Sequence, residues 1–304
     1  MISKMIRIAG MILLASFAFR PAAAATCSNA SLTGTYGFLH SGTAGDGTPI
    51  IGLSQLTFDP STGTYSGDDT QSHDGVLSTE PLTATYVVAP DCTVTATVTV
   101  GENSQNIALV VTPKGFFSLI QRTSVTTEGF ALKQGAAACT NAGAEGTFGF
   151  EATGVFVAGA PATGPVAFIG ELKFALNSSG KGEISGHISS SENGTILTFA
   201  EESVTGSFTI ATDCTGTATI RPKGAPALHF SLVVVDGGKE MLAIETDENT
   251  VVGGTLLKGS SATNTGASDR PATMPEDEEP RAVSAPNQPL RINSPRTTSP
   301  PAAL

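Results

Sequence analysis

The chain contains four histidines, whose side chains often act as general bases or bind metal ions near neutral pH. They are His40, His73, His187 and His229. The chain has no His-Glu-x-x-His zinc motif, no Gly-x-Ser-x-Gly around a nucleophilic serine and no glycine-rich phosphate loop. A strand or surface role is therefore the better interpretation of each histidine. We expect no catalytic residue, no metal site and no cofactor.

Two groups of acidic residues offer the oxygen ligands that calcium prefers. The first group is Asp68, Asp69 and Asp74, beside an expected hairpin, and the second is Glu245, Asp247 and Glu248, in an expected loop before the last strand. Neither group has the spacing of the twelve-residue calcium loop. Because loops commonly carry solvated charges, turn residues explain both groups better than an ion site does.

All four cysteines lie in sequences that occur twice. Residues 27–38 and 139–150 are identical at 7 of 12 positions, and both segments begin with cysteine. The tripeptide Asp-Cys-Thr occurs at 91–93 and again at 213–215. The chain therefore contains two tandem copies of one module.

The repeat argues against an active site shared by the two modules. Such a site would need matching side chains, and the histidines do not match one another. His187 aligns with Asp68, and His73 aligns with Glu192.

The cysteines favour disulfides over metal binding, since the chain has no Cys-x-x-Cys and begins like an exported protein. Four cysteines allow three pairings, and the repeat makes one of them natural: Cys27 with Cys92, and Cys139 with Cys214. Each disulfide would close a loop of more than 60 residues. In the chain-entropy picture such a loop stabilises its module by about 4 kcal/mol.

Alternation with a period of two predicts half-buried antiparallel strands. The apolar residues from Val94 to Val100 alternate with threonines from Thr93 to Thr99. Asp74-Gly75 and Asn193-Gly194 occupy matching places and suit tight hairpin turns. Counting strands between turns gives about eight per module. In module one they start near Gly34, Ile50, Thr64, Val76, Thr93, Gln105, Phe116 and Gly129.

Eight short strands joined by tight turns favour an up-and-down barrel, because closure removes unpaired strand edges. In such a barrel Cys27 and Cys92 would lie at the same end. The rival fold is an immunoglobulin-like sandwich, which normally has a core tryptophan and a tyrosine two residues before its second cysteine. This chain has no tryptophan and has Pro90 at that position. We therefore expect an all-β protein of two tandem eight-stranded antiparallel barrels.

Aromatic residues form a row on the inward side of the expected strands. The row contains Tyr36, Phe38, Tyr86, Phe148, Phe150 and Phe208, opposite small residues. They either fill each barrel or leave a cavity for an apolar ligand, which they would line. We favour the filled interior, because protein interiors are close-packed. His40 falls on the same face, where module two has Ala152, and would place a polar group near a barrel mouth.

Composition divides the chain into four parts. Residues 1–25 have the positive start, apolar core and small residues of a cleaved signal peptide. Residues 26–134 and 139–258 are the two barrel modules. Residues 259–304 hold 8 of the 18 prolines and an acidic run, and we expect a disordered tail there, with a spacer or adhesive role as the alternative.

The chain is acidic, with a net charge of −11. Removal of the three basic residues in the signal segment leaves 13 basic against 27 acidic residues, a net charge of −14. An acidic surface repels nucleic acid, so we exclude a nucleic-acid role. No apolar run after the signal reaches the roughly 20 residues of a transmembrane helix. We expect an exported protein that is secreted, periplasmic or on the cell surface.

Two resemblances add to this picture. Gly34-Thr-Tyr36 and Gly146-Thr-Phe148 resemble a weakened lipocalin Gly-x-Trp signature, in which another aromatic residue replaces tryptophan and the lipocalin C-terminal helix is missing. The cysteine segments, together with residues 235–240 and 245–247, are similar to uncharacterised secreted proteins of environmental bacteria. The resemblances imply a calycin-like barrel and export, and they imply no activity.

We therefore predict a non-catalytic exported protein that binds an unknown protein, surface or ligand. The alternative is a lipocalin-like carrier of a small apolar ligand. A cofactor-free barrel enzyme of isomerase type is the third hypothesis. A buried carboxylate with a strongly shifted pKa beside a pocket would support it.

Overall fold

The structure is a computed structural model of the chain. It describes residues 26–100, 103–121, 125–135, 139–160, 163–198 and 204–259, without the side chains of 103, 119–121, 125, 197 and 198. The signal segment expected at 1–25 and the tail expected at 259–304, apart from Gly259, lie outside these residues. The described residues form an all-β fold, as predicted, with two one-turn 3-10 helices, η1 (Asn29–Ser31) and η2 (Asp236–Gly238).

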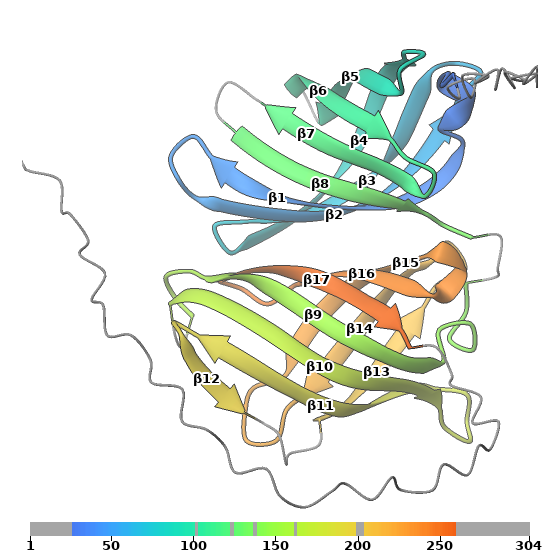
Figure 1. The fold of residues 1–304 in the computed structure, drawn as a ribbon. Coiled ribbons are helices and arrows are strands. Elements are labelled where there is room, and N and C mark those ends of the chain that lie inside the picture. Colours follow the sequence, from blue (N-terminus) through green and yellow to red (C-terminus); the bar gives the residue numbers. More distant parts are fainter. Residues whose placement is uncertain are drawn as a thin grey trace, which may run out of the picture. The chain divides into compact units, whose positions relative to one another are not determined.

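Barrel one is a closed antiparallel meander (Figure 1). Its strands are β1 (Gly34–Ala44), β2 (Pro49–Asp59), β3 (Thr64–His73), β4 (Val76–Val88), β5 (Thr93–Val100), β6 (Asn103–Val111), β7 (Gly115–Gln121) and β8 (Val125–Lys133). Each strand pairs with the next, and β8 pairs with β1 to close the ring. All eight expected strands are present, and β8 alone begins more than two residues from its expected start.

Barrel two repeats this architecture. Its strands are β9 (Gly146–Phe156), β10 (Gly164–Leu176), β11 (Gly182–Glu192), β13 (Val204–Ile210), β14 (Thr215–Arg221), β15 (Leu228–Val235), β16 (Glu240–Glu245) and β17 (Thr250–Lys258). Pairing of β17 with β9 and of β10 with β11 closes the ring. A short extra strand, β12 (Thr195–Thr198), pairs with the end of β11. The prediction of two eight-stranded barrels is confirmed.

Aromatic side chains fill the end of each barrel that carries the cysteines, which we call the disulfide end. In barrel one the ring of Phe58 lies 5.3 Å from those of Tyr36 and Tyr86, centroid to centroid. In barrel two the ring of Phe174 lies 5.2 Å from that of Phe148 and 4.8 Å from that of Phe208. Such aromatic clusters bury large apolar areas and stabilise both cores.

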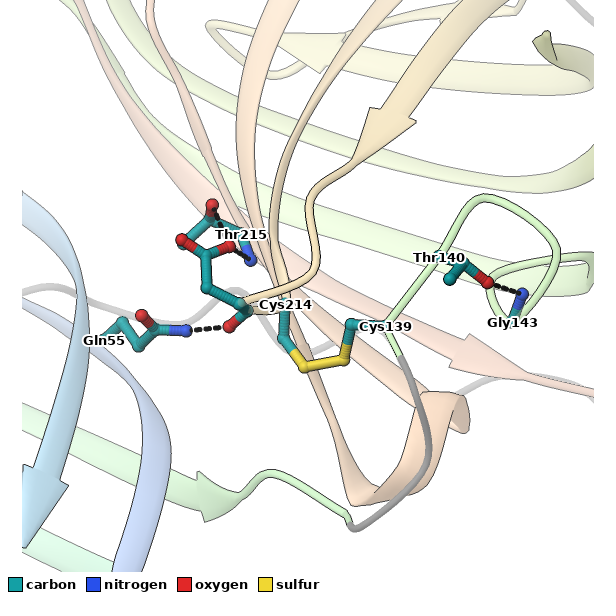
Figure 2. Close-up of a disulfide and its surroundings, with 7 residues drawn as sticks. Gln55, Cys139, Thr140, Gly143, Cys214 and Thr215 are labelled. Carbon is teal, nitrogen blue, oxygen red and sulfur yellow. Dashed lines mark hydrogen bonds between the residues drawn. A yellow bond between two sulfur atoms is a disulfide. The ribbon is translucent and has the colours of Figure 1, made fainter.

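The disulfides join the pairs that the repeat predicts, Cys27 with Cys92 and Cys139 with Cys214. Figure 2 shows the second of them. The second cysteine of each pair has a positive φ, 69° at Cys92 and 75° at Cys214. Each disulfide links the segment before the first strand of its barrel to the turn after the fourth strand.

Polar side chains around the disulfides explain two further repeated residues. Asp91 accepts hydrogen bonds from the backbone N–H and the hydroxyl of Thr93, at 3.0 and 2.6 Å, and Asp213 does the same for Thr215. These bonds lower the pKa of both carboxyls. Asn29 accepts from the N–H of Val88. Its repeat partner Asn141 accepts in the same way from the N–H of Ile210, so both asparagines tie the start of a module to its fourth strand.

The outer faces of the two barrels share an apolar cluster, and the described residues form one compact unit. Barrel one contributes Leu39, Ile51 and Leu53, and barrel two contributes Val233, Val235, Leu242, Ile244 and Val251. Gly37 on β1 faces this cluster, where a Cβ atom would lie 2.7 Å from Val235 Cγ1. The Gln55 amide also donates to the backbone carbonyl of Asp213 (Figure 2).

Candidate functional site

Barrel one contains a cavity of about 210 Å³ at the end opposite its disulfide, which we call the open-end cavity. Its apolar lining includes Phe38, Leu56, Tyr65, Leu82, Val98 and Ile107. Its polar lining includes His40, Ser54, Asp69, Gln71, Gln105 and Thr127. The cavity therefore offers apolar surface together with several hydrogen-bonding groups.

Three of the polar side chains form a hydrogen-bonded cluster across β1, β2 and β3. Ser54 lies opposite Asp69 in the pairing of β2 with β3, and its hydroxyl donates to Asp69 Oδ1 at 2.7 Å. His40 Nε2 lies 3.1 Å from the same oxygen. The imidazole and the hydroxyl thus meet at one carboxylate oxygen.

This arrangement sets the hydrogen positions on the imidazole. An ionised carboxylate can only accept hydrogen bonds, so Nε2 of His40 carries the hydrogen that points at Asp69. In the neutral ring Nδ1 is then a bare acceptor. The ring of Phe38 stacks on the imidazole, with centroids 5.2 Å apart. A Cβ atom at position 52 would overlap the imidazole, and glycine at that position leaves room for the ring.

Three buried polar atoms around the cavity have no hydrogen-bond partner among the described residues. They are Nδ1 of His40, Oε1 of Gln105 and Oγ1 of Thr127. His40 is 7% exposed and Thr127 is 4% exposed. Nearly all buried polar groups in proteins are paired, and an unpaired one costs about 1–3 kcal/mol.

Barrel two has apolar residues or glycine at the equivalent positions. The strand register identifies them, because Gly34 pairs with Phe58 in barrel one and Gly146 with Phe174 in barrel two. The equivalents of His40, Ser54, Asp69, Gln105 and Thr127 are Ala152, Gly170, Ile188, Leu228 and Val252. Gly52, below the imidazole, is replaced by Phe168. The polar cluster is therefore a difference between the barrels rather than a requirement of the fold.

The six aromatic residues expected to line a cavity are all buried. Phe38 lines the open-end cavity. Tyr36 and Tyr86 pack with Phe58 at the disulfide end, and Phe148, Phe150 and Phe208 belong to the core of barrel two.

The first acidic group does not converge on one point. Successive residues of a strand point to opposite faces, so Asp69 faces the cavity and Asp68 faces outward. Asp74 lies in the following turn with a φ of 50°. Within the described part of the chain, no three His, Cys, Asp or Glu side chains come together in a way that could hold a metal ion.

The interpretation of Glu245 as a solvated loop residue is wrong. Glu245 is the last residue of β16, lies opposite Phe230 and is 1% exposed. Burial, and secondarily the negative charge of Asp247, raises its pKa to about 8. Its Oε2 has no hydrogen-bond partner among the described residues. Asp247, in contrast, is 2.7 Å from Nδ1 of His229 through its Oδ1. Glu245 does not line the open-end cavity, so this shifted carboxyl group does not by itself indicate catalysis there.

The cluster of His40, Ser54 and Asp69 was not foreseen from the sequence. A signal for it exists in the hairpin register. Asp74-Gly75 fixes the pairing of β3 with β4, and the period of two then places Asp69 on the inward face with Tyr65. Alignment of the two modules then shows that Asp69 is a polar residue at a position where module two has the apolar Ile188.

Comparison with known proteins gives little further information. No model of a known protein family matches the chain, and no curated protein matches it. One solved structure that it is similar to is a protein of unknown function from the DUF3598 family of Nostoc punctiforme PCC 73102. The match has 12% identity and a TM-score of 0.23, and covers 76% of this chain and 97% of the other. Similarity at this level carries no argument about fold or function. No helix among the described residues is long and apolar enough to cross a membrane.

Proposed function

We propose that the protein is a non-catalytic binding protein whose first barrel holds one small molecule in the open-end cavity. The observation that carries this proposal is a set of buried polar atoms on His40, Gln105 and Thr127 that surround an interior space and have no partner in the described part of the chain. The ligand would have an apolar body, which contacts the aromatic and aliphatic lining, and a polar group, which pairs with these atoms.

The cost of these polar atoms supports a role in binding. Each unpaired group destabilises the folded barrel, and barrel two shows that the same architecture forms with Ala152, Leu228 and Val252 instead. Stability alone would therefore favour the apolar residues. A bound molecule that pairs with the polar groups offsets their cost.

Export is part of the proposal. Two disulfides are typical of proteins that fold outside the cytosol, and they support the expectation that the protein is secreted, periplasmic or on the cell surface. The proposal combines the two binding hypotheses drawn from the sequence, and it differs from the apolar carrier in requiring a polar group on the ligand.

The test is a fluorescence titration of the full chain with N-phenyl-1-naphthylamine, a neutral probe with a large apolar body and one N–H donor. We expect saturable binding of one probe per chain. In the double variant Gln105→Leu/Thr127→Val, which introduces the residues of barrel two, we expect at least tenfold weaker binding. The control is Ser190→Ala, which removes an unpartnered buried hydroxyl from barrel two. Absence of binding, or an equal loss in the control, would contradict the proposal.

A further inference from the structure

We infer that the ligand of the open-end cavity carries a neutral hydroxyl group that donates a hydrogen bond to Nδ1 of His40. This inference rests on the proposed function and specifies the chemical class of the ligand. It predicts that a neutral alcohol binds in this cavity more tightly than a carboxylate of the same chain length.

The neighbours of His40 favour one tautomer of its neutral ring. Asp69 Oδ1 accepts a hydrogen bond from the N–H at Nε2 of His40, and the two atoms are 3.1 Å apart. The Ser54 hydroxyl donates to the same oxygen and helps to hold it in place. Phe38 stacks on the ring and restricts its rotation. In the neutral ring Nδ1 is therefore an acceptor, which a donor from the ligand can pair with.

The groups that line the cavity disfavour a charged ligand. A carboxylate would place its lone pairs against the lone pair of Nδ1, in a cavity that Asp69 and Glu80 also line. Buried anions need donors or positive charges as partners. Thr127, Gln71 and Gln105 could donate to such a group, but Asp69 and Glu80 would repel it. An alkylammonium group could donate to Nδ1 and pair with Asp69 or Glu80, but it loses far more hydration on burial than a neutral group does. A hydroxyl group donates at a smaller cost in hydration.

Thr127 lies close to His40 on the neighbouring strand. In the pairing of β1 with β8, His40 lies opposite Gly129, and Thr127 is the diagonal neighbour on the same face. Its buried hydroxyl is unpartnered among the described residues and can donate to the oxygen of a ligand hydroxyl. One hydroxyl group would thus satisfy two buried atoms on neighbouring strands, as donor to one and acceptor from the other.

The experiment compares three small probes by ligand-detected NMR titration of the full chain at pH 7.5. Hexan-1-ol and its isomer 1-methoxypentane have the same atoms, but only the alcohol has a donor. Hexanoate has the same six-carbon chain and an anionic head. We expect hexan-1-ol to bind about tenfold tighter than 1-methoxypentane, as the loss of one hydrogen bond to a buried acceptor implies. We expect hexanoate to bind more weakly still.

The outcomes separate this inference from the proposed function. If none of the probes binds, both fall. If the ether binds as well as the alcohol, or if hexanoate binds as well or better, the hydroxyl inference is overturned while the binding function stands.

A variant assigns the effect to His40. His40→Leu keeps an apolar group of similar size and removes the acceptor, so the preference for alcohol over ether should disappear. Thermal melting checks that the variant folds, and His40→Ala, the residue of barrel two, is the second choice. A tenfold preference that persisted in the folded variant would contradict the role of His40.

Discussion

Thr127 and Val252 occupy equivalent positions in the two barrels and differ by one hydroxyl in place of a methyl group. Both are buried, Thr127 at 4% exposure and Val252 at 0%. The side chain at position 252 is apolar, whereas the one at position 127 carries a hydroxyl that has no hydrogen-bond partner among the described residues.

Thr127→Val should therefore stabilise the ligand-free protein. The substitution removes a buried, unpartnered hydroxyl with little change in volume, and we expect the free energy of unfolding to rise by about 1–2 kcal/mol. Urea denaturation measures this change. Thr83→Val, at an exposed position on β4, is the matched control and should change stability by less than about 0.5 kcal/mol. A loss of stability in Thr127→Val would show that its hydroxyl has a structural partner.

Glu245 predicts a pH dependence of stability. Its pKa is about 8 in the folded chain, above the ordinary value near 4.5, so the folded state binds the proton more tightly than the unfolded state. Stability is unaffected below about pH 4.5 and falls as the pH rises towards 8. At pH 7 the cost is roughly 3 kcal/mol.

Glu245→Gln removes this proton linkage. Its stability relative to the natural chain should be lowest at pH 5 and should rise towards pH 8, as measured by urea unfolding at several pH values. Parallel pH profiles for the two proteins would mean that Glu245 is ionised or hydrated in the fold.

Sequence patterns carried less information about Asp69 and Glu245 than about the strands that contain them. Alternation could place Asp69 and Glu245 on inward faces only once the strand ends were known, and Glu245 lies at the last position of β16. Acidic residues near a turn are usually solvated, so the pattern favoured a loop. Burial of a carboxyl group depends on packing from other strands, which one sequence does not show.

The Asp-Cys-Thr turn shows how local sequence positions whole strands. The aspartate bonds to the threonine two residues later, and the cysteine between them takes a positive φ. This turn joins β4 to β5 and β13 to β14. Each of the three residues of the motif therefore has a structural reason to recur that does not depend on any activity.

The disulfides should contribute much of the stability of their barrels. The double variant Cys139→Ser/Cys214→Ser opens a loop with a sequence separation of 75 residues. We expect its free energy of unfolding to fall by about 4 kcal/mol in the chain-entropy picture. Urea denaturation of oxidised protein measures the loss. The same double change at Cys27 and Cys92, separated by 65 residues, should cost a similar amount, and a change below 1 kcal/mol in both variants would contradict the entropic account.

Strand positions were predictable because they depend on local signals. Asp74-Gly75 and Asn193-Gly194 form the turns they suggest, with positive φ at all four residues. The threonine–valine alternation of β5 is also reproduced as an exposed and a buried face. Closure of each ring could be predicted from the number of strands and from the placement of both cysteines of a module at the same end of a barrel. The extra strand β12 was not expected, because it pairs only with the end of β11.

At the scale of the whole molecule, duplication has produced two barrels with the same topology and different interiors. The disulfide ends are alike, with aromatic cores and matching asparagine, aspartate and cysteine residues. The opposite ends differ, since barrel one has the His40 cluster where barrel two has apolar side chains. The two copies thus share a scaffold, and their difference supports the proposal that barrel one carries the binding role.

The central claim is that barrel one, and not barrel two, holds a small molecule at its open end. Photolabelling of the full chain with a diazirine-bearing hexanol, followed by peptide mass spectrometry, tests it directly because barrel two is an internal control. We predict labels on peptides of β1, β3, β6 and β8 around His40 and Thr127, suppressed by excess hexan-1-ol. Equal labelling of both barrels, or labelling that hexan-1-ol does not suppress, would contradict the account.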